Sequence, residues 1–291
     1  MQLKMGSSSN SRPTGNAISF NGQLFTPETP LITAGNRGFR YGDGLFETIR
    51  VVNSEIRLAN LHFERLLAGM RSLLFEPPYP TADDLSRQIL DLCKHNGHAN
   101  GARVRLMIFR GEGGLHDPDG QKPSYIIQSE PWPSTGIELN KEGYKLGIYP
   151  EGRKSCDELA SIKSNNYLLY SMASRYARTR GWDDCLVLNA YDRIAESSIA
   201  NLFYCKKGII YTPPLTEGCI AGVMRRWLIA KAPSIGIPII ERPLTQEELG
   251  EADEVFLTNA LRGIKWAGSL DRAHYTCHIA RLLHEAIMQE L

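Results

Sequence analysis

The sequence predicts an α+β protein of two domains, for three reasons. The chain has 291 residues, 42% of them hydrophobic, which is enough for one large core or two moderate ones. Segments with helical spacing and segments with strand spacing are mixed in both halves without regular alternation, which favours α+β over a doubly wound sheet. Pro, Gly and Ser accumulate between the halves, near Ser134. We therefore expect a small α+β domain over 18–133, an interdomain linker over 134–143 and a large domain over 144–291.

Charge and hydropathy exclude several classes of protein. Lys and Arg number 33 and Asp and Glu 32, so the formal net charge is +1, and no long block carries one sign. This balance argues against proteins that bind nucleic acids or membrane surfaces through a strong field of one sign. No apolar run approaches the roughly 18 residues that span a bilayer, and the N-terminus has no apolar signal core. We expect a cytoplasmic protein without nucleic-acid or membrane partners.

The cysteines and histidines do not predict a metal site. The six cysteines are scattered and form no C-x-x-C pair, so we expect reduced thiols instead of a zinc ribbon or a disulfide framework. His274 and His278 are four residues apart, a spacing that would suit a metal pair on a helix. No acidic third ligand lies nearby in the sequence, so we expect His278 to lie beside Ile279, Leu282 and Leu283 on an amphipathic C-terminal helix instead.

In the first half, residues 1–17 are rich in Ser, Gly and Asn and predict a disordered or non-native tail. A hairpin is expected over 17–26, with its turn at Asn21-Gly22, and a second strand pair over 44–58, with its turn at Asn53-Ser54. Two single strands are expected over 102–109 and 124–130. Apolar spacing predicts helices over 60–75 and over 81–97, the second with Thr81 as N-cap and Gly97 as C-cap.

In the second half, a strand over 144–150 comes before a predicted helix over 166–181 that ends at Gly181. The expected buried face of this helix is Leu168, Leu169, Met172, Ala173 and Tyr176. Further strands are expected over 184–190, 199–205, 208–214, 238–244 and 254–260. Polar turns at 191–193 and 206–208 join the first three of these strands, a helix over 221–232 comes before the fourth, and a final helix ends the chain.

Several common site motifs are absent. The sequence has no phosphate loop, no G-x-G-x-x-G after a strand, no H-E-x-x-H and no G-x-S-x-G. The glycine-rich segment "RGEGGLHD", 110–117, leads into polar residues instead of a helix, so we interpret it as a loop over a site and not as a dinucleotide cradle.

Lys163 lies in "LASIKSNNYL", between an apolar stretch and a predicted helix start. An amine can form a Schiff base only when part of it is neutral, so its pKa must be lowered by burial or by nearby positive charge. The apolar stretch provides partial burial and the helix start provides positive potential. Since lysines are mostly exposed, these features by themselves leave two readings open: an ordinary surface lysine, or a reactive amine.

Five ordered motifs carry a resemblance to a known family. They are "NRGFRYGDGLFETIRV", "LHFERL", "IKSNNYL", "RIAESSIANLFYCKKGIIYTPPLTEGCIAGVMRR" and "ADEVFLTNAL". Together they resemble the class IV aminotransferases, and the resemblance covers the chain from Asn21 to Leu261. It implies the α+β, two-domain fold type IV of D-amino-acid aminotransferase-like enzymes, with a small N-terminal and a larger C-terminal cofactor-binding domain. The implied cofactor is pyridoxal 5'-phosphate.

The resemblance also implies roles for individual residues. Lys163 corresponds to the catalytic lysine that binds the cofactor as a Schiff base and moves a proton. Glu196 corresponds to the carboxylate that faces the pyridine nitrogen and keeps it protonated. Arg65 corresponds to the phosphate-binding arginine, assisted by the backbone N–H groups of Val223 and Met224.

Two further cofactor contacts follow from the resemblance. Ala260 occupies the position where many relatives have a Thr whose hydroxyl contacts the phosphate. Alanine has no hydroxyl, so only the backbone N–H of Ala260 could make that contact, with Asn259 next to it in the sequence. Tyr167 is similar to a tyrosine that some members place near the phenolic oxygen of the cofactor.

The segments "FRGEGG", "TPPLTEGCIAGVMRR" and "NAL" resemble the 4-amino-4-deoxychorismate lyases of the family more than its other members. Such a lyase converts 4-amino-4-deoxychorismate to p-aminobenzoate and pyruvate. Its substrate has two carboxylates, which arginines would anchor. The candidate substrate-binding residues are Phe46, Arg40, Arg103, Arg105, Arg110 and Arg193, with Arg103 and Arg105 on one strand face, opposite Val104.

An aminotransferase for branched-chain L-amino acids or for D-amino acids is the alternative, because Glu47 in "GLFET" is typical of the transaminases. A family scaffold that has lost its chemistry is disfavoured, since Lys163 and Glu196 are both present. The resemblance further implies a homodimer whose active sites are shared across the interface, with the segment 38–46 as the candidate contribution from the neighbouring subunit.

Overall fold

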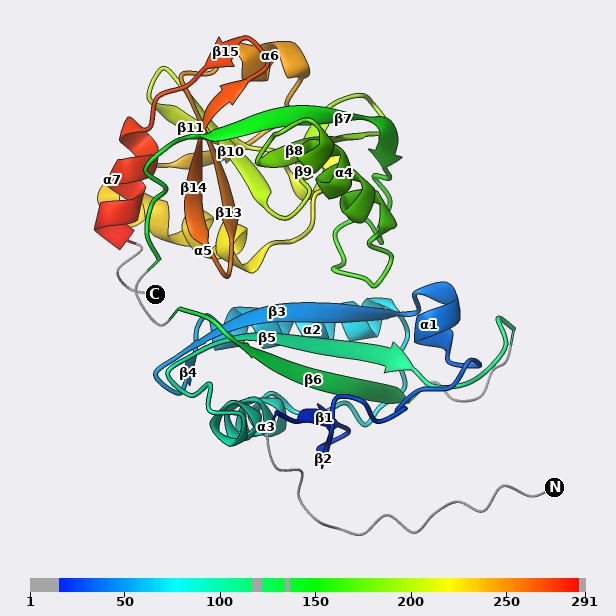
Figure 1. Ribbon diagram of the computed structural model, residues 1–291. Helices are drawn as coiled ribbons and strands as arrows, with labels where there is room; N and C mark the ends of the chain where they lie inside the picture. Colours follow the sequence, from blue (N-terminus) through cyan, green and yellow to red (C-terminus); the bar gives the residue numbers. More distant parts are fainter. Residues whose placement is uncertain (1–15, 117–121, 134–136, 288–291) are drawn as a thin grey trace, which may run out of the picture.

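The computed structural model describes residues 16–116, 122–133 and 137–287. Most of the tail predicted over 1–17 therefore lies outside the described residues. Two β-sheets lie one above the other (Figure 1), each packed against its own helices. This is the two-domain α+β arrangement that the sequence predicted. We call the part built on the first sheet the small domain and the part built on the second sheet the large domain.

The small domain has a six-stranded antiparallel sheet in the order β2-β1-β6-β5-β3-β4. Its strands are β1 (Ile18–Phe20), β2 (Gln23–Phe25), β3 (Gly44–Val52), β4 (Glu55–Ile56), β5 (Gly101–Arg110) and β6 (Pro123–Pro131). Its helices are α1 (Arg37–Tyr41), α2 (Ala59–Ser72) and α3 (Ala82–His95). The two predicted strand pairs, the two single strands and both long helices are confirmed. Thr81 caps α3 as predicted, but the C-cap is Asn96, and Gly97 follows it at φ +74°.

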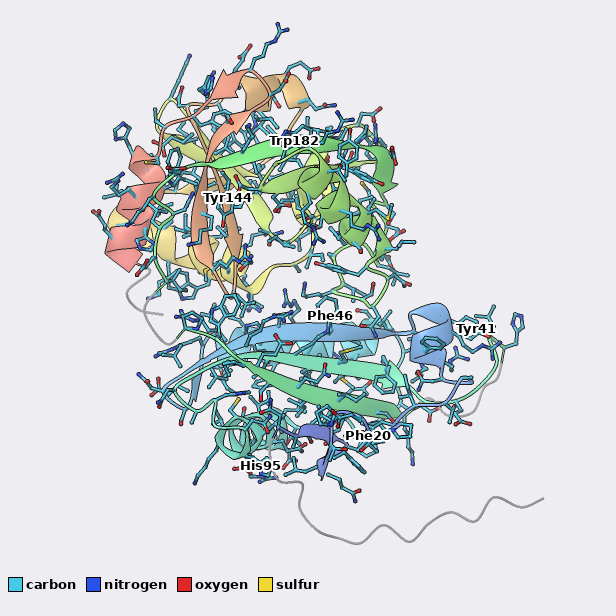
Figure 2. The ribbon with its side chains drawn as sticks, viewed as in Figure 1. Phe20, Tyr41, Phe46, His95, Tyr144 and Trp182 are labelled. Atoms are coloured by element: carbon cyan, nitrogen blue, oxygen red, sulfur yellow. The ribbon has the colours of Figure 1, made fainter. Side chains whose placement is uncertain are left out.

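Strand alternation gives the first sheet two different faces. Val104, Leu106 and Ile108 of β5 are fully buried against α2 and α3. The residues between them, including Arg103 and Arg105, point to the opposite face. In Figure 2 the labelled Phe46 of β3 lies on that opposite face, which is turned toward the large domain. The small domain thus presents an aromatic ring and two arginines to the space between the domains.

The large domain has a nine-stranded mixed sheet in the order β12-β11-β10-β13-β14-β7-β8-β9, with β15 paired to β14. Its strands are β7 (Tyr144–Lys154), β8 (Asp184–Asn189), β9 (Ile194–Ser197), β10 (Asn201–Lys206), β11 (Ile209–Thr212), β12 (Ile239–Glu241), β13 (Glu254–Asn259), β14 (Gly263–Leu270) and β15 (Ala273–His274). Its helices are α4 (Leu168–Thr179), α5 (Val223–Lys231), α6 (Gln246–Gly250) and α7 (His278–Ile287), with short 3-10 turns η1 (Leu215–Glu217) and η2 (Ala232–Ile235).

The sequence analysis missed three strands and one short helix of this domain. β9, which carries Glu196, lies between the predicted turn at 191–193 and the predicted strand from 199, where no element was expected. β14 contains two glycines and both buried and half-buried residues, so its sequence has no clean alternation, yet it lies in the middle of the sheet. β15 and α6 are too short to give a periodic signal.

The buried face of α4 also differs from the prediction. Tyr170, Ala173 and Ala177 are buried against β7 and β8, whereas Leu168 is 74% and Met172 41% exposed. Apolar residues occur all around this helix, so spacing alone could not identify the side that meets the sheet. Gly181, at φ +69°, follows the end of the helix as predicted.

The predicted linker, 134–143, lies between β6 and β7. Residues 134–136 lie outside the described residues, and the remainder packs on the large domain, where the Asn140 side-chain oxygen accepts a hydrogen bond from the Trp266 backbone N–H at 3.0 Å. The domain limits themselves stay a prediction.

Three smaller predictions concern the cysteines, the histidines and membrane helices. All six cysteines are unpaired thiols. His274 lies in β15 and His278 begins α7, so the two do not share a helix face. Within the described ranges, no helix combines the length and apolarity that crossing a membrane requires.

Candidate active site

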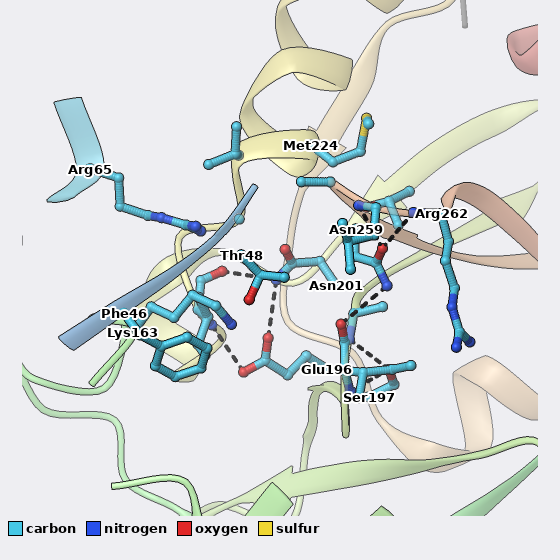
Figure 3. A pocket seen from close by; sticks show the side chains of 18 of the residues that line it. Phe46, Thr48, Arg65, Lys163, Glu196, Ser197, Asn201, Met224, Asn259 and Arg262 are labelled. Carbon is cyan, nitrogen blue, oxygen red and sulfur yellow. Dashed lines mark hydrogen bonds between the residues drawn. The ribbon is translucent and has the colours of Figure 1, made fainter. Parts of the chain in front are cut away.

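A cavity of about 410 Å³ lies between the two domains. The small domain contributes side chains from β3, α2 and β5 and one that follows β6: Phe46, Thr48, Arg65, Arg103, Arg105 and Trp132. The large domain contributes Lys163 and Tyr167, residues 196–197 and 199–201, the start of α5 and the turn 258–262. Figure 3 shows Lys163 beside Phe46, with Glu196 to their right and Arg262 at the far side. The cavity therefore contains most of the residues that the family resemblance singled out.

The loop that carries Lys163 is attached to β3 of the other domain. The backbone N–H of Phe46 donates to the Lys163 carbonyl at 3.0 Å, and the N–H of Asn165 donates to the Gly44 carbonyl at 2.9 Å. A Cβ atom at Gly44 would lie 2.3 Å from the Ile108 carbonyl oxygen and 2.5 Å from the Asn165 side-chain nitrogen. Only glycine allows this close approach. The "YGDG" segment thus fixes the lysine loop at the domain junction.

The Lys163 amine is buried among aromatic rings. Its Nζ lies 3.3 Å from the Tyr167 hydroxyl and 4.4 Å from the centre of the Phe46 ring. Burial lowers the pKa of Lys163 to about 7, and the guanidinium of Arg65 acts in the same direction, although the carboxylates of Glu47 and Glu196 oppose it. The sequence analysis attributed part of this effect to a helix start, but α4 begins only at Leu168. Burial is the main cause.

We expect the rate at which an amine reagent modifies Lys163 to increase about ten-fold between roughly pH 6 and pH 8, because the neutral fraction of the amine grows as the pH passes its lowered pKa, about 7. Peptide mass spectrometry of samples labelled at several pH values measures this rate. Exposed Lys145, labelled in the same samples, is the internal control. An equal pH dependence at both lysines would contradict the lowered pKa.

Glu196 lies on β9 and is only 3% exposed. Its Oε1 accepts hydrogen bonds from Lys154 Nζ at 2.8 Å, from the Tyr170 hydroxyl at 2.5 Å and from the Ile220 backbone N–H at 3.0 Å. Its Oε2 accepts one from the Asn201 side-chain amide at 3.1 Å. The sequence analysis identified Glu196 but not its partners, because their positions in the chain carry no common pattern.

Arg65 is held by Glu47, which is almost fully buried. Arg65 Nε donates to Glu47 Oε1 at 2.7 Å, and His62 Nδ1 lies 2.7 Å from Glu47 Oε2. Burial by itself raises the pKa of Glu47, but the charge of Arg65 and the contact with His62 outweigh it and lower the pKa to about 2. A further Arg65 nitrogen donates to the Ala221 carbonyl at 3.0 Å, directly before α5. Glu47 therefore orients Arg65 toward the start of that helix.

The start of α5 forms an anion cradle with Arg65. Val223 and Met224 occupy the first two positions of the helix, where backbone N–H groups have no partner within the helix. Gly222 precedes them, and a Cβ atom there would lie 1.8 Å from the Asn201 side-chain oxygen. The N–H groups and the positive end of the helix favour a phosphate at this point.

The turn after β13 closes the cavity on the other side. The Asn259 side-chain oxygen accepts hydrogen bonds from the backbone N–H groups of Leu261 at 3.1 Å and Arg262 at 2.9 Å, so it shapes the turn in which Ala260 lines the cavity. The hydroxyl of Thr258 is buried and has no hydrogen-bond partner among the described residues. The sequence analysis identified Ala260, two residues further along the chain, but not Thr258.

The structure separates the six proposed substrate residues into two groups. Phe46, Arg103 and Arg105 line the cavity, and the two arginines share a strand face as predicted. Three other proposed arginines are not among the residues that line it, and their role in substrate binding stays a prediction: Arg40, Arg110 and Arg193.

Each of these three arginines has a different environment. Arg110 is buried and paired with Asp43, and Arg193 is paired with Glu217 at 2.5 Å. Arg40 is exposed on α1, where its guanidinium lies 5.1 Å from the ring of Tyr41. The described part of the "RGEGG" loop pairs with Asn36 near α1, and none of its described residues is among those that line the cavity. Sequence alone missed the cavity residues Thr48, Trp132 and Arg262.

Comparisons with known proteins agree with this geometry. The family model described as amino-transferase class IV matches residues 44–265. A putative branched-chain-amino-acid aminotransferase of Methanocaldococcus jannaschii is 30% identical over 83% of this chain and 83% of its own length. An aminodeoxychorismate lyase of Bacillus subtilis is also 30% identical, over 89% of this chain and 88% of its own length.

Among solved structures, 4-amino-4-deoxychorismate lyase from Pseudomonas aeruginosa superposes with a TM-score of 0.83 and 29% identity, covering 94% of this chain and 99% of that one. Relatives of both kinds are thus equally similar. The extent of the family match and the identity over most of the chain show that this protein belongs to the amino-transferase class IV family.

Proposed function

We propose that the protein is a pyridoxal 5'-phosphate enzyme in which Lys163 binds the cofactor covalently. The residues present fit that group: a buried amine with a lowered pKa, a buried carboxylate at Glu196, and an anion cradle of Arg65 with the N–H groups of Val223 and Met224. The cradle would hold the phosphate and Glu196 would pair with the ring nitrogen. When bound, the cofactor supplies an electron sink for a carbanion at the substrate.

Lys163 is also suited to move the proton that the reaction requires. With a pKa of about 7, its amine exists in both forms near neutral pH and can accept and return a proton. The rings of Phe46 and Tyr167 contact each other edge to face, and their centres lie 4.4 Å and 5.0 Å from Nζ. The Tyr167 hydroxyl, 3.3 Å away, orients the amine toward the cavity.

We propose 4-amino-4-deoxychorismate lyase as the specific activity, with p-aminobenzoate and pyruvate as products. The observation that carries this choice is the excess of arginine at the substrate side of the cavity: Arg103, Arg105 and Arg262. Arg103 is balanced by Glu130 at 2.7 Å, while Arg105 and Arg262 form no salt bridge with any residue in the described ranges. Two cations that form no salt bridge with the described residues suit a substrate with two carboxylates.

An aminotransferase for branched-chain L-amino acids or for D-amino acids is the second candidate. Phe46, Trp132, Ile199 and Leu261 give the same cavity an apolar wall that suits an aliphatic side chain. The motif around Glu47 also matches the transaminases, and Glu47 has a definite role here, as the residue that orients Arg65.

Two assays of the cofactor-loaded protein distinguish these candidates. The first follows formation of p-aminobenzoate and pyruvate from 4-amino-4-deoxychorismate. The second follows the visible spectrum on separate addition of L-leucine, D-alanine and L-glutamate. We expect product formation in the first assay and an unchanged spectrum in the second. A spectrum that bleaches with one amino acid, without lyase activity, would identify an aminotransferase of that handedness, and a protein that binds no cofactor would overturn the whole proposal.

We expect Arg105→Gln to raise the KM for the dicarboxylate substrate about 10-fold to 100-fold, because a charged hydrogen bond contributes about 1.5–3 kcal/mol. The Arg105 guanidinium lines the cavity, 4.0 Å from the centre of the Phe46 ring. Steady-state kinetics measure the effect. Arg153→Gln, at an exposed pair with Asp192, is the control and should leave KM unchanged.

We further propose that the enzyme acts in the cytoplasm as a homodimer with active sites completed across the interface. Exposed apolar side chains on both domains support this assembly: Phe39 of α1 is 72% exposed, and Leu168 and Met172 of α4 are also exposed. Sedimentation of the full chain should give the mass of two copies, whereas a monomer that is fully active would contradict the proposal.

A further inference from the structure

A second buried lysine lies next to the proposed cofactor site. Lys154 is the last residue of β7 and is 8% exposed. The register of β7 against β8 shifts between Tyr149 and Arg153, which marks a bulge. After this bulge Arg153 points outward to Asp192, while Lys154 turns inward. The bulge therefore delivers the amine of Lys154 into the interior beside Glu196.

The contacts of Glu196 distinguish its two oxygens. Oε1 accepts three hydrogen bonds, from Lys154, from Tyr170 and from the backbone of Ile220. Oε2 accepts one, from Asn201, whose side chain is itself fixed by a bond to the Ile220 carbonyl at 2.8 Å. Since Glu196 lines the cavity, Oε2 is the oxygen with capacity left for a ligand. The arrangement fixes both the position and the orientation of the carboxylate.

The charge of Lys154 has a separate effect from the hydrogen bonds. A carboxylate that is 3% exposed is stable as an anion only if a cation or several donors compensate for its lost hydration. Tyr170, Ile220 and Asn201 are neutral donors, so Lys154 is the cation in direct contact. The amine of Lys163 also interacts electrostatically with Glu196, but burial favours its neutral form and lowers its pKa to about 7. Lys163 is therefore a poor substitute for the charge of Lys154.

We propose that Lys154 is a positioning residue that keeps Glu196 ionised, with Oε2 turned toward the cavity. The inference rests on the proposed function in one respect: the ionised Glu196 is what would hold a proton on the ring nitrogen of the bound cofactor. Without Lys154, Glu196 takes up a proton itself and can no longer stabilise a protonated ring nitrogen. Tyr170, whose ring lies 5.1 Å from Lys154 Nζ, supports the same oxygen.

Infrared difference spectra of the cofactor-free full chain test the protonation directly. We expect Lys154→Met to show the carbonyl band of a protonated carboxylic acid that the parent protein lacks. The double variant Lys154→Met/Glu196→Gln assigns the band, because it should vanish there. Lys154→Arg restores the charge and should show no band. The matched control is Lys206→Met, at a half-buried lysine 3.8 Å from Glu251. Absence of the band in folded Lys154→Met would overturn the proposal.

Cofactor binding gives the second readout. We expect Lys154→Met to weaken pyridoxal 5'-phosphate binding about 10-fold or more and to shift the absorption maximum of the bound form, and Lys154→Arg to recover both. Unfolding of the cofactor-free variants shows whether a loss is merely structural. If Lys154→Met does not fold, Tyr170→Phe, which removes one donor to the same oxygen, should weaken binding in the same direction, and an unchanged affinity there would contradict the proposal.

The two readouts separate this inference from the proposed function. If the parent protein binds no pyridoxal 5'-phosphate but Lys154→Met shows the acid band, the proposed function fails and the local role of Lys154 stands. If the parent binds the cofactor through Lys163 but Lys154→Met shows neither the band nor a weaker affinity, the inference fails and the proposed function stands.

Discussion

Lys163→Ala will remove the covalently bound cofactor and lower activity by about 10³-fold or more, since general acid–base catalysis alone contributes about 10²-fold to 10⁴-fold. The amine of Lys163 lies in the cavity with a pKa lowered to about 7, and its loop is fixed to β3 by backbone hydrogen bonds. Alanine keeps those backbone bonds, so the variant should fold. The visible spectrum and borohydride reduction followed by peptide mass spectrometry measure the loss.

The control for this experiment is Lys145→Ala, because that lysine is exposed at the start of β7. It should keep the visible band and the activity. Lys154 is the alternative candidate for covalent cofactor binding, since its amine is also buried near Glu196. Recovery of the reduced cofactor on Lys154 in the parent protein would show that the assignment of the covalent lysine is wrong.

Glu47→Gln will lower the free energy of unfolding by about 3 kcal/mol at neutral pH, because removing one partner of a buried ion pair leaves the other charge uncompensated. Arg65 and His62 both contact Glu47, and the side chain of Glu47 is 1% exposed. These contacts lower the pKa of Glu47 to about 2, from 4.5 in the unfolded chain. The corresponding stabilisation is on the order of 3 kcal/mol.

The sign of the pH dependence follows from the lowered pKa. Stabilisation by Glu47 is fully present above the unfolded value, 4.5, and is lost as the pH falls toward the folded value, about 2. Denaturant titrations across that window should show a steeper acid loss for the parent protein than for Glu47→Gln. Glu130→Gln, at the exposed pair with Arg103, should cost under about 1 kcal/mol. Equal effects of the two substitutions would contradict a structural role for the Glu47 cluster.

The sequence was a good guide where a local pattern determines the structure. The turn at Asn21-Gly22, the N-cap at Thr81 and the apolar spacing of α2 were all confirmed. Lys163, Arg65 and Glu196 came from ordered family motifs and meet in one cavity. In these cases a few neighbouring residues contain the whole signal.

The sequence was a poor guide where the outcome depends on distant partners. Arg110 and Arg105 both lie on β5, yet Arg110 is drawn to Asp43 and Arg105 faces the cavity. Alternation places the two on opposite faces of the strand, but it does not show which face meets the cavity or that Asp43 lies beside Arg110. For the same reason the exposed side of α4 was misassigned, since the sheet that buries its other side is formed by β7 and β8.

By itself, the sequence determined the α+β class, most of the elements and the family, because hydrophobic period, caps and motifs act over short stretches of chain. Only the tertiary structure decided which charges are paired. Lys154 forms an ion pair with Glu196 because a bulge in β7 turns its side chain inward. Glu47 forms an ion pair with Arg65 because α2 packs against β3. Ion pairs between distant residues depend on strand register and domain packing, which a single sequence does not show. The reactivity of Lys163 follows from that packing, since burial between two domains is what lowers its pKa to about 7.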